Sequence, residues 1–289
     1  MLRLEAGSNY FIREPNHTNM LIRLGFDMSF DLPAPAAFVA QLRVHPSRIA
    51  DLREPDRFHT TPELPLEEYT DGFGNLCTRF YAPAGELRLY HSTLIEDSGQ
   101  PDPVSPRARE IPPQELPSDV LQFLLSSRYC EVDLLSQTAV NLFGGITPGW
   151  ERVAAICNWV HTNVTFGYNF ARSTKTAREV FIERTGVCRD FQHLAVTFCR
   201  ALNIPARYVA GYLGDIQVPI NDPMDFSAWF EAYLDGRWWT FDARNNQSRV
   251  GRVLMATGRD AADVAFLTSF GTAILKYFEV VSDEVRSAA

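Results

Sequence analysis

The residue with the clearest chemical potential is Cys188, which opens a predicted helix over residues 187–202. In the first turn of a helix the backbone N–H groups lack partners, and the helix dipole favours an anion. This setting lowers the pKa of a thiol and makes the thiolate available as a nucleophile. The same N–H groups could stabilise a developing oxyanion, and Arg189 adds a positive charge nearby. The alternative is that Cys188 is a small buried residue, as free cysteines usually are.

A second set of candidate residues lies on two predicted strands joined by the Asp235-Gly236 turn, a pair that favours a two-residue hairpin. The hairpin would bring Ser227 and Asp242 to comparable positions on neighbouring strands. Asp242 ends a strongly apolar strand, and a buried carboxylate must be paired or hydrogen-bonded. This makes Asp242 a candidate site residue, with a residue that opens a turn as the alternative.

Two stretches of the chain resemble the core of the transglutaminase-like superfamily. The first is GVCRDFQHLA at residues 186–195, followed by RALNIPARYVAGY at 200–212; the second contains AWFE at 228–231 and WTFD at 239–242. The resemblance covers about residues 150–245. It implies a papain-like fold and a Cys-His-Asp triad for acyl transfer, in the form of amide cross-linking, peptide hydrolysis or deamidation. The β-rich first half is more weakly similar to the N-terminal region of bacterial members.

Carried over by position, the resemblance implies that Cys188 is the nucleophile and that Asp242 orients the histidine. The family's histidine precedes the Ala-Trp pair, and this chain has Ser227 there. Serine cannot act as a general base near neutral pH and cannot form an ion pair with a thiolate. No histidine follows His193 in the chain. The implied catalytic set is therefore Cys188, Asp242 and Ser227, without the family's base.

Three neighbouring residues are candidates for contacting a substrate: Trp229, Arg189 and Asp225. Trp229 belongs to an aromatic cluster that alternates along the predicted strands, and core packing is its alternative role. Asp225 lies near the place of the missing histidine, where a carboxylate could serve as a substitute acid or base.

The other histidines offer weaker substitutes. His193 is five residues beyond Cys188, about 140° around the helix, so the two side chains point apart and helix packing is the alternative role. His161 follows Cys157 at a spacing that suits a shared metal ion, but two ligands are too few for a site. His91, on a predicted strand, would have to reach across the domain interface. We expect neither a metal nor a cofactor.

The composition is that of a globular protein with a well-buried core: 289 residues, 46% hydrophobic and 21% charged. The net charge is −8, and the scattered basic residues argue against nucleic acid as a partner. Five cysteines without a CxxC motif argue against a disulfide framework. The chain has no apolar run of about 18 residues and no signal peptide, so we expect a cytoplasmic protein that does not bind membranes.

The order of elements predicts an α+β fold. A polar extension at residues 1–19 precedes a β-rich domain at 20–98, and six prolines mark a linker at 99–117. The core is predicted at 118–289. Its helices are expected near residues 119–126, 150–161, 176–183 and 187–202, followed by antiparallel strands over 207–213, 226–234, 237–242 and 273–281.

Three functions follow from these observations. The first is a cysteine acyl-transfer enzyme, a protease or amidase or a transglutaminase-like enzyme, in which the helix terminus and Arg189 stabilise the Cys188 thiolate. Its substrate would be a peptide bond or a side-chain amide of a protein. The second is a catalytically inactive relative that binds peptides or a protein partner. The third is a different chemistry in the same cleft.

Overall fold

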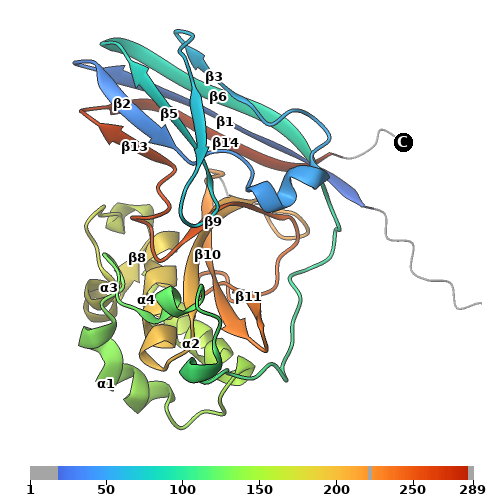
Figure 1. The fold of residues 1–289 in the computed structure, drawn as a ribbon, viewed down its shortest axis with the longest axis vertical. Coiled ribbons are helices and arrows are strands. Elements are labelled where there is room, and N and C mark those ends of the chain that lie inside the picture. The colour runs from blue at the N-terminus through green and yellow to red at the C-terminus, as the bar shows by residue number, and fades with distance from the viewer. Residues whose placement is uncertain (1–18, 221–222, 286–289) are drawn as a thin grey trace, which may run out of the picture.

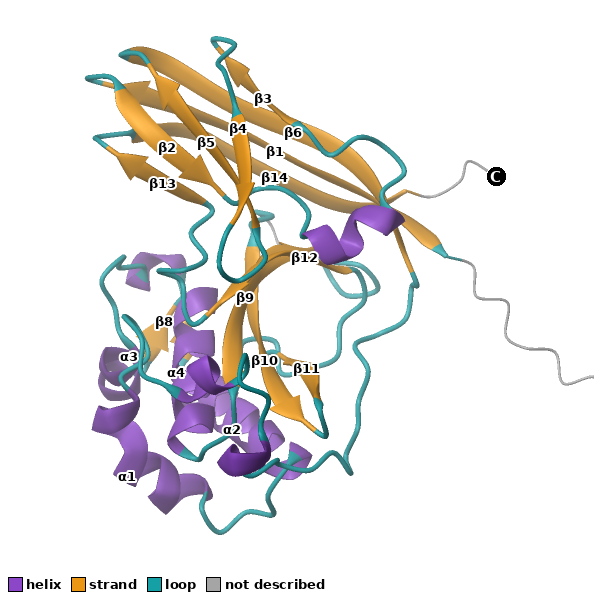
Figure 2. Ribbon diagram, viewed as in Figure 1, coloured by secondary structure: helices purple, strands orange, loops and turns teal. Residues whose placement is uncertain are grey.

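The computed structural model describes residues 19–220 and 223–285. It consists of a β-sandwich and a core of helices packed on a sheet, which lie one above the other in Figures 1 and 2. The predicted α+β class is confirmed. The predicted polar extension at residues 1–19 lies, apart from Asn19, outside the described residues.

Two four-stranded antiparallel sheets form the sandwich, with the orders β14-β1-β6-β3 and β13-β2-β5-β4. Along β1 every second side chain points into the core: Ile22, Leu24 and Phe26 are buried, whereas Arg23 is partly exposed. The strands are β1 (Met20–Leu32), β2 (Ala36–Ala40), β3 (Phe58–Thr61), β4 (Glu67–Thr70), β5 (Leu76–Ala82), β6 (Gly85–Asp97), β13 (Leu267–Phe270) and β14 (Ile274–Val285).

The last two strands correct the predicted domain division, which placed all of residues 118–289 in the core and the strand over 273–281 in its sheet. Instead, β14 pairs with β1 and β13 pairs with β2, so the C-terminal segment completes the sandwich. The residues of a strand indicate which of its faces is buried, but not which neighbour supplies its hydrogen bonds. The sandwich therefore contains strands from both ends of the described chain.

The core sheet has the order β11-β10-β9-β12, and α4 packs against β9 and β10. All residues of α4 from Asp190 to Arg200 are buried, because the sheet covers one side of this helix and the other helices cover the opposite side. The elements are α1 (Val132–Phe143), α2 (Trp150–Asn163), α3 (Ala177–Glu183), α4 (Cys188–Ala201), β9 (Ala206–Leu213), β10 (Ser227–Leu234), β11 (Arg237–Phe241) and β12 (Arg252–Gly258), with a short parallel pair of β7 (Thr165–Phe166) and β8 (Thr185–Gly186).

Most of the predicted helices are present. Thr176 caps α3 through a capping box with Glu179, as Thr at this position favours. The segment predicted as a helix at 119–126 is only a 3₁₀ turn, η3 (Leu121–Leu124), which lacks a side-chain cap, and α1 was not predicted. None of the helices in the described part of the chain has the length and hydrophobicity needed to span a bilayer.

The predicted linker at residues 99–117 runs along the core with no regular structure other than the 3₁₀ turn η2 (Pro113–Glu115) (Figure 1). Ion pairs fasten it to the core. The Asp102 carboxylate accepts from Arg252 Nε at 2.8 Å, and Glu110 pairs with Arg152 at 2.9 Å. The linker is therefore part of the packed structure.

The sandwich and the core share one continuous hydrophobic cluster, in which Phe226 is central. Its ring lies 6.1 Å from Phe26 of the sandwich and 5.3 Å from Tyr212 of β9, measured between ring centroids. A second link is the pair of hydrogen bonds between the Asn75 side chain and the Thr257 backbone, at 2.8 and 2.9 Å. Because Ser227 follows Phe226, the sandwich helps to position the start of β10.

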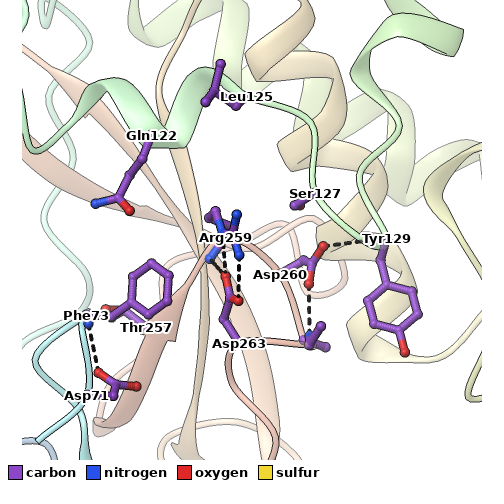
Figure 3. A network of polar contacts seen from close by, with 12 residues as sticks. Asp71, Phe73, Gln122, Leu125, Ser127, Tyr129, Thr257, Arg259, Asp260 and Asp263 are labelled. Atoms are coloured by element: carbon purple, nitrogen blue, oxygen red, sulfur yellow. Dashed lines mark hydrogen bonds and ion pairs between the residues drawn. The ribbon is translucent and has the colours of Figure 1, made fainter.

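The loop after β12 is also held firmly, as Figure 3 shows. The Asp260 carboxylate accepts from the backbone N–H of Tyr129 at 2.7 Å and of Ala262 at 2.9 Å. Arg259 pairs with Asp263 at 2.8 Å. These contacts attach the end of the core sheet to the segment that precedes α1.

Candidate functional site

Cys188 is the first residue of α4. The turn into the helix is fixed by Asp190, whose carboxylate accepts from the Val187 N–H at 3.0 Å. Gly186 is needed for this approach, since a Cβ there would lie 2.7 Å from the Asp190 side chain. The described residues include all five cysteines; four of them are buried and Cys188 is partly exposed. The sequence therefore folds so that its one accessible thiol sits at a helix N-terminus.

A pocket of about 520 Å³ opens in front of this thiol. Segments far apart in the sequence contribute to it: the end of α2, β7, the start of α4, the start of β10 and the loop after β11. The lining residues with chemical significance are His161, Phe166, Cys188, Asp225, Ser227 and Arg244. Three of the predicted site residues, Cys188, Ser227 and Asp225, are thus brought together.

The surroundings of Cys188 do not favour the predicted resting thiolate. Burial and the negative charge of Asp225 raise the pKa of Cys188 to about 11. The positive charge of Arg244 and the backbone N–H of Arg189 act in the opposite direction, but less strongly. These surroundings favour the neutral thiol of Cys188 at neutral pH, despite its place at the helix terminus.

Arg189 turns away from the pocket, which corrects its predicted role beside the sulfur. Its guanidinium pairs with Asp190 at 3.0 Å and donates to the Arg172 carbonyl oxygen at 2.6 Å. It also lies over the Tyr129 ring, 5.4 Å from the centroid. Successive helix residues point about 100° apart, so a neighbour in sequence need not face the same cavity.

Asp242 is buried, and both of its carboxylate oxygens accept hydrogen bonds. One carboxylate oxygen accepts from Gln192 and from the backbone N–H groups of Arg244 and Asn245, at 2.9–3.1 Å. The other accepts from Asn245 at 2.7 Å and from Arg252 at 2.9 Å. Burial would raise the pKa of Asp242, but the charge of Arg252 and the hydrogen bonds from Asn245 hold it below its usual value.

Arg252 is the residue that most changes the interpretation of the implied triad. Its guanidinium is buried and bridges Asp242 and Asp102, at 2.9 and 2.8 Å. The carboxylate that would orient a histidine in a triad is thus paired with a permanent cation. Asp242 opens a turn, the role that the sequence left as its alternative, and in addition holds an ion pair that the sequence did not indicate.

The structure places Trp229 inside the core, outside the lining of the Cys188 pocket. Its ring packs against Gly211 of β9, where an added Cβ would lie 2.5 Å from the indole. Arg252 lies over the same ring, 5.0 Å from the centroid. The aromatic residue implied as a substrate contact therefore supports the Asp242–Arg252 pair from within the core.

Two of the histidines considered as substitutes have structural roles. His193 is buried, stacks on Tyr129 with 5.1 Å between centroids, and accepts from the Ala261 N–H at 3.1 Å. Burial lowers the pKa of His193 well below its usual value, so the ring is neutral. His91 is buried in the sandwich, where it pairs with Asp56 at 2.7 Å.

His161 is the functional candidate that the sequence analysis missed, since it was considered only as a metal ligand. It lies at the end of α2 and lines the pocket with Cys188. Its Nδ1 lies 2.7 Å from the carbonyl oxygen of Arg244. A carbonyl can only accept, so Nδ1 carries a proton, and in the neutral imidazole the lone pair is therefore on Nε2. Only the tertiary fold brings the end of α2 beside the loop after β11, so no local signal could have shown this.

The charge of Asp225 gives a first prediction. Asp225→Asn is expected to speed the alkylation of Cys188 by iodoacetamide at pH 8 by roughly two- to tenfold, because removing the negative charge lowers the thiol pKa. The measurement is the labelling rate of the Cys188 peptide by mass spectrometry. Asp27→Asn, in the sandwich, is the matched control and should leave the rate unchanged. Slower labelling of the Asp225 variant would contradict the assigned electrostatics.

Comparisons with known proteins agree with this geometry. Residues 136–243 match the model of the transglutaminase-like superfamily. A solved structure from Cytophaga hutchinsonii, named a "putative cysteine protease", is 31% identical and aligns over 94% of this chain and 93% of that one with a TM-score of 0.81. Uncharacterized proteins of Mycobacterium leprae and Mycobacterium tuberculosis are 26% and 28% identical, over 73% and 67% of this chain and 77% and 68% of their own.

The fold and the site thus define a papain-like α+β protein with a cysteine at the start of its central helix. The chain belongs to the transglutaminase-like superfamily. The family resemblance predicted from residues 186–242 is confirmed, and so is the fold.

Proposed function

We propose that the protein is a cysteine acyl-transfer enzyme, of the protease or amidase kind, which attacks amide carbonyls through Cys188. The observation that carries this proposal is the single partly exposed cysteine at the first turn of α4, open to a pocket of about 520 Å³. Unpaired N–H groups of that turn can stabilise the oxyanion of a tetrahedral intermediate. The likeness to the Cytophaga hutchinsonii protein supports the same chemistry.

The proton of the Cys188 thiol needs an acceptor, and His161 is our candidate. Its free Nε2 lone pair belongs to the one imidazole that lines the pocket within the described residues. The sulfur attacks the carbonyl carbon, the thiol proton passes to Nε2, and the same proton then goes to the departing amine as the C–N bond breaks. The resulting thioester is cleaved by water or by a second amine.

Turnover of fluorogenic peptide amides by four proteins tests the proposal. Relative to the wild type, we expect Cys188→Ser to lose at least about a thousandfold and His161→Gln about ten- to a hundredfold in kcat/KM. His59→Gln is the control, because His59 lies on β3 of the sandwich and lacks contact with the pocket. Equal turnover by the wild type and Cys188→Ser would refute the proposal.

A second candidate function is favoured by the pairing of Asp242 with Arg252. With that carboxylate neutralised and Ser227 in the histidine's place, the fold can hold a peptide without cleaving it. Saturable peptide binding, blocked by alkylation of Cys188 but without turnover dependent on Cys188, would support this function instead.

A further inference from the structure

Arg244 lines the pocket and differs from the neighbouring Arg249 in its contacts. Its guanidinium lies over the Phe166 ring, 4.0 Å from the centroid, and Nη1 donates to the Asn245 side chain at 3.1 Å. Its Nε is buried without a hydrogen-bond partner, and no carboxylate within residues 19–220 and 223–285 forms an ion pair with it. By contrast, Arg249 in the same pocket pairs with Asp215 at 3.2 Å. Arg244 therefore presents an unpaired cation to the pocket.

The backbone around Arg244 is fixed on both sides. Its N–H donates to Asp242 at 2.9 Å, and its carbonyl oxygen accepts from His161 at 2.7 Å. The guanidinium lies against the Phe166 ring, and its Nη2 donates no hydrogen bond to a residue in the described part of the chain. A guanidinium held in place with unused N–H donors is well suited to bind a carboxylate.

The charge of Arg244 also reaches the reacting sulfur. It acts on Cys188 in the direction that lowers the thiol pKa, and it acts likewise on the carboxyl of Asp225. Asp225 would repel a second negative charge that approached from its own side of the pocket. An anionic group of the substrate is therefore favoured on the side of Arg244.

We propose that Arg244 binds a carboxylate of the substrate, so that the pocket selects amides or peptides that carry a free carboxylate close to the reacting carbonyl. This inference rests on the proposed function, because it assumes that the protein has a substrate. Binding of a carboxylate at Arg244 can nevertheless be tested without turnover. An acidic residue next to the scissile bond or the C-terminal carboxylate of a short peptide would meet this requirement.

Iodoacetate and iodoacetamide form a matched pair of probes for this site. With each reagent the Cys188 thiolate attacks the methylene carbon, the C–I bond breaks and iodide leaves. The two reagents differ only in that iodoacetate carries a carboxylate where iodoacetamide carries an amide. Both react with the same thiolate, so the ratio of their alkylation rates does not depend on the fraction of Cys188 that is ionised. We expect the iodoacetate to iodoacetamide ratio at Cys188 to exceed that of glutathione by about tenfold, with saturation in iodoacetate.

Two variants test whether Arg244 causes the raised ratio of iodoacetate to iodoacetamide labelling. Arg244→Gln should reduce the ratio at Cys188 to that of glutathione. Arg237→Gln is the matched control, because Arg237 also stacks on an aromatic ring, 4.1 Å from the Trp239 centroid, but lies outside the pocket. In the wild type, acetate should slow the reaction with iodoacetate more than chloride of equal ionic strength, a test that needs no variant.

A ratio at wild-type Cys188 equal to that of glutathione, or an unchanged ratio in Arg244→Gln, would overturn the inference. An elevated, Arg244-dependent ratio supports it even if peptide amides are not cleaved, in which case only the proposed enzyme activity fails. Conversely, turnover dependent on Cys188 together with an ordinary labelling ratio would retain the enzyme and remove the carboxylate site.

Discussion

Arg252→Met is expected to lower the free energy of unfolding by about 3–5 kcal/mol at neutral pH, the usual cost of removing one partner from a buried ion pair. The Arg252 guanidinium is buried between Asp242 and Asp102, and its loss leaves the first of these carboxylates buried without a cation. Methionine roughly fills the volume, so the effect reports the lost charge rather than a large cavity. Urea unfolding monitored by circular dichroism measures it.

The pH dependence of this effect has a definite sign. The pKa of Asp242 is held below its usual value, so its contribution to stability is present at neutral pH and is lost as the pH falls through the folded-state pKa. The difference between the wild type and Arg252→Met should therefore shrink as the pH falls below about 4. Arg79→Met, which breaks an exposed pair with Glu67, is the control and should barely move the midpoint. A loss equal to that of the control would show that the Arg252 pair is not structurally important.

Much of the fold could be predicted because its signals are local. The helix start at Cys188, the capping residue Thr176 and the Asp235-Gly236 hairpin each depend on a few adjacent residues. The pairing of β14 with β1 could not be predicted in this way. It joins strands at opposite ends of the chain, and alternation of side chains does not specify a partner.

The same holds for the site: residues within the family motif could be predicted, whereas residues whose roles depend on tertiary contacts could not. Cys188, Asp225 and Ser227 were found from motif position, and the structure places all three in one pocket. His161 and Arg252 were missed, because their roles arise from contacts with residues about 80 and 10 positions away, across turns of the fold. A resemblance to a family transfers expected roles to aligned positions, but it cannot show that Asp242 is already held by a cation.

Iodoacetamide labelling of Cys188 is expected to rise about a hundredfold between pH 7.5 and 9.5. With a pKa of about 11, the thiolate fraction grows tenfold with each pH unit over this range. Glutathione, with an ordinary thiol pKa near 8.5, should rise only about tenfold and then level off. Per-cysteine mass spectrometry gives both rates in one sample, and the buried Cys199 serves as an internal control for unfolding at high pH.

A plateau of the Cys188 rate below pH 8 would mean that the sulfur is already ionised, as in a thiolate–imidazolium pair. The steep rise, by contrast, would leave only about one molecule in ten thousand with a thiolate at pH 7. Turnover at that pH would then require proton removal during the attack itself, by His161 or by the substrate, rather than a preformed anion. The labelling profile thus decides which kind of base the Cys188 pocket needs.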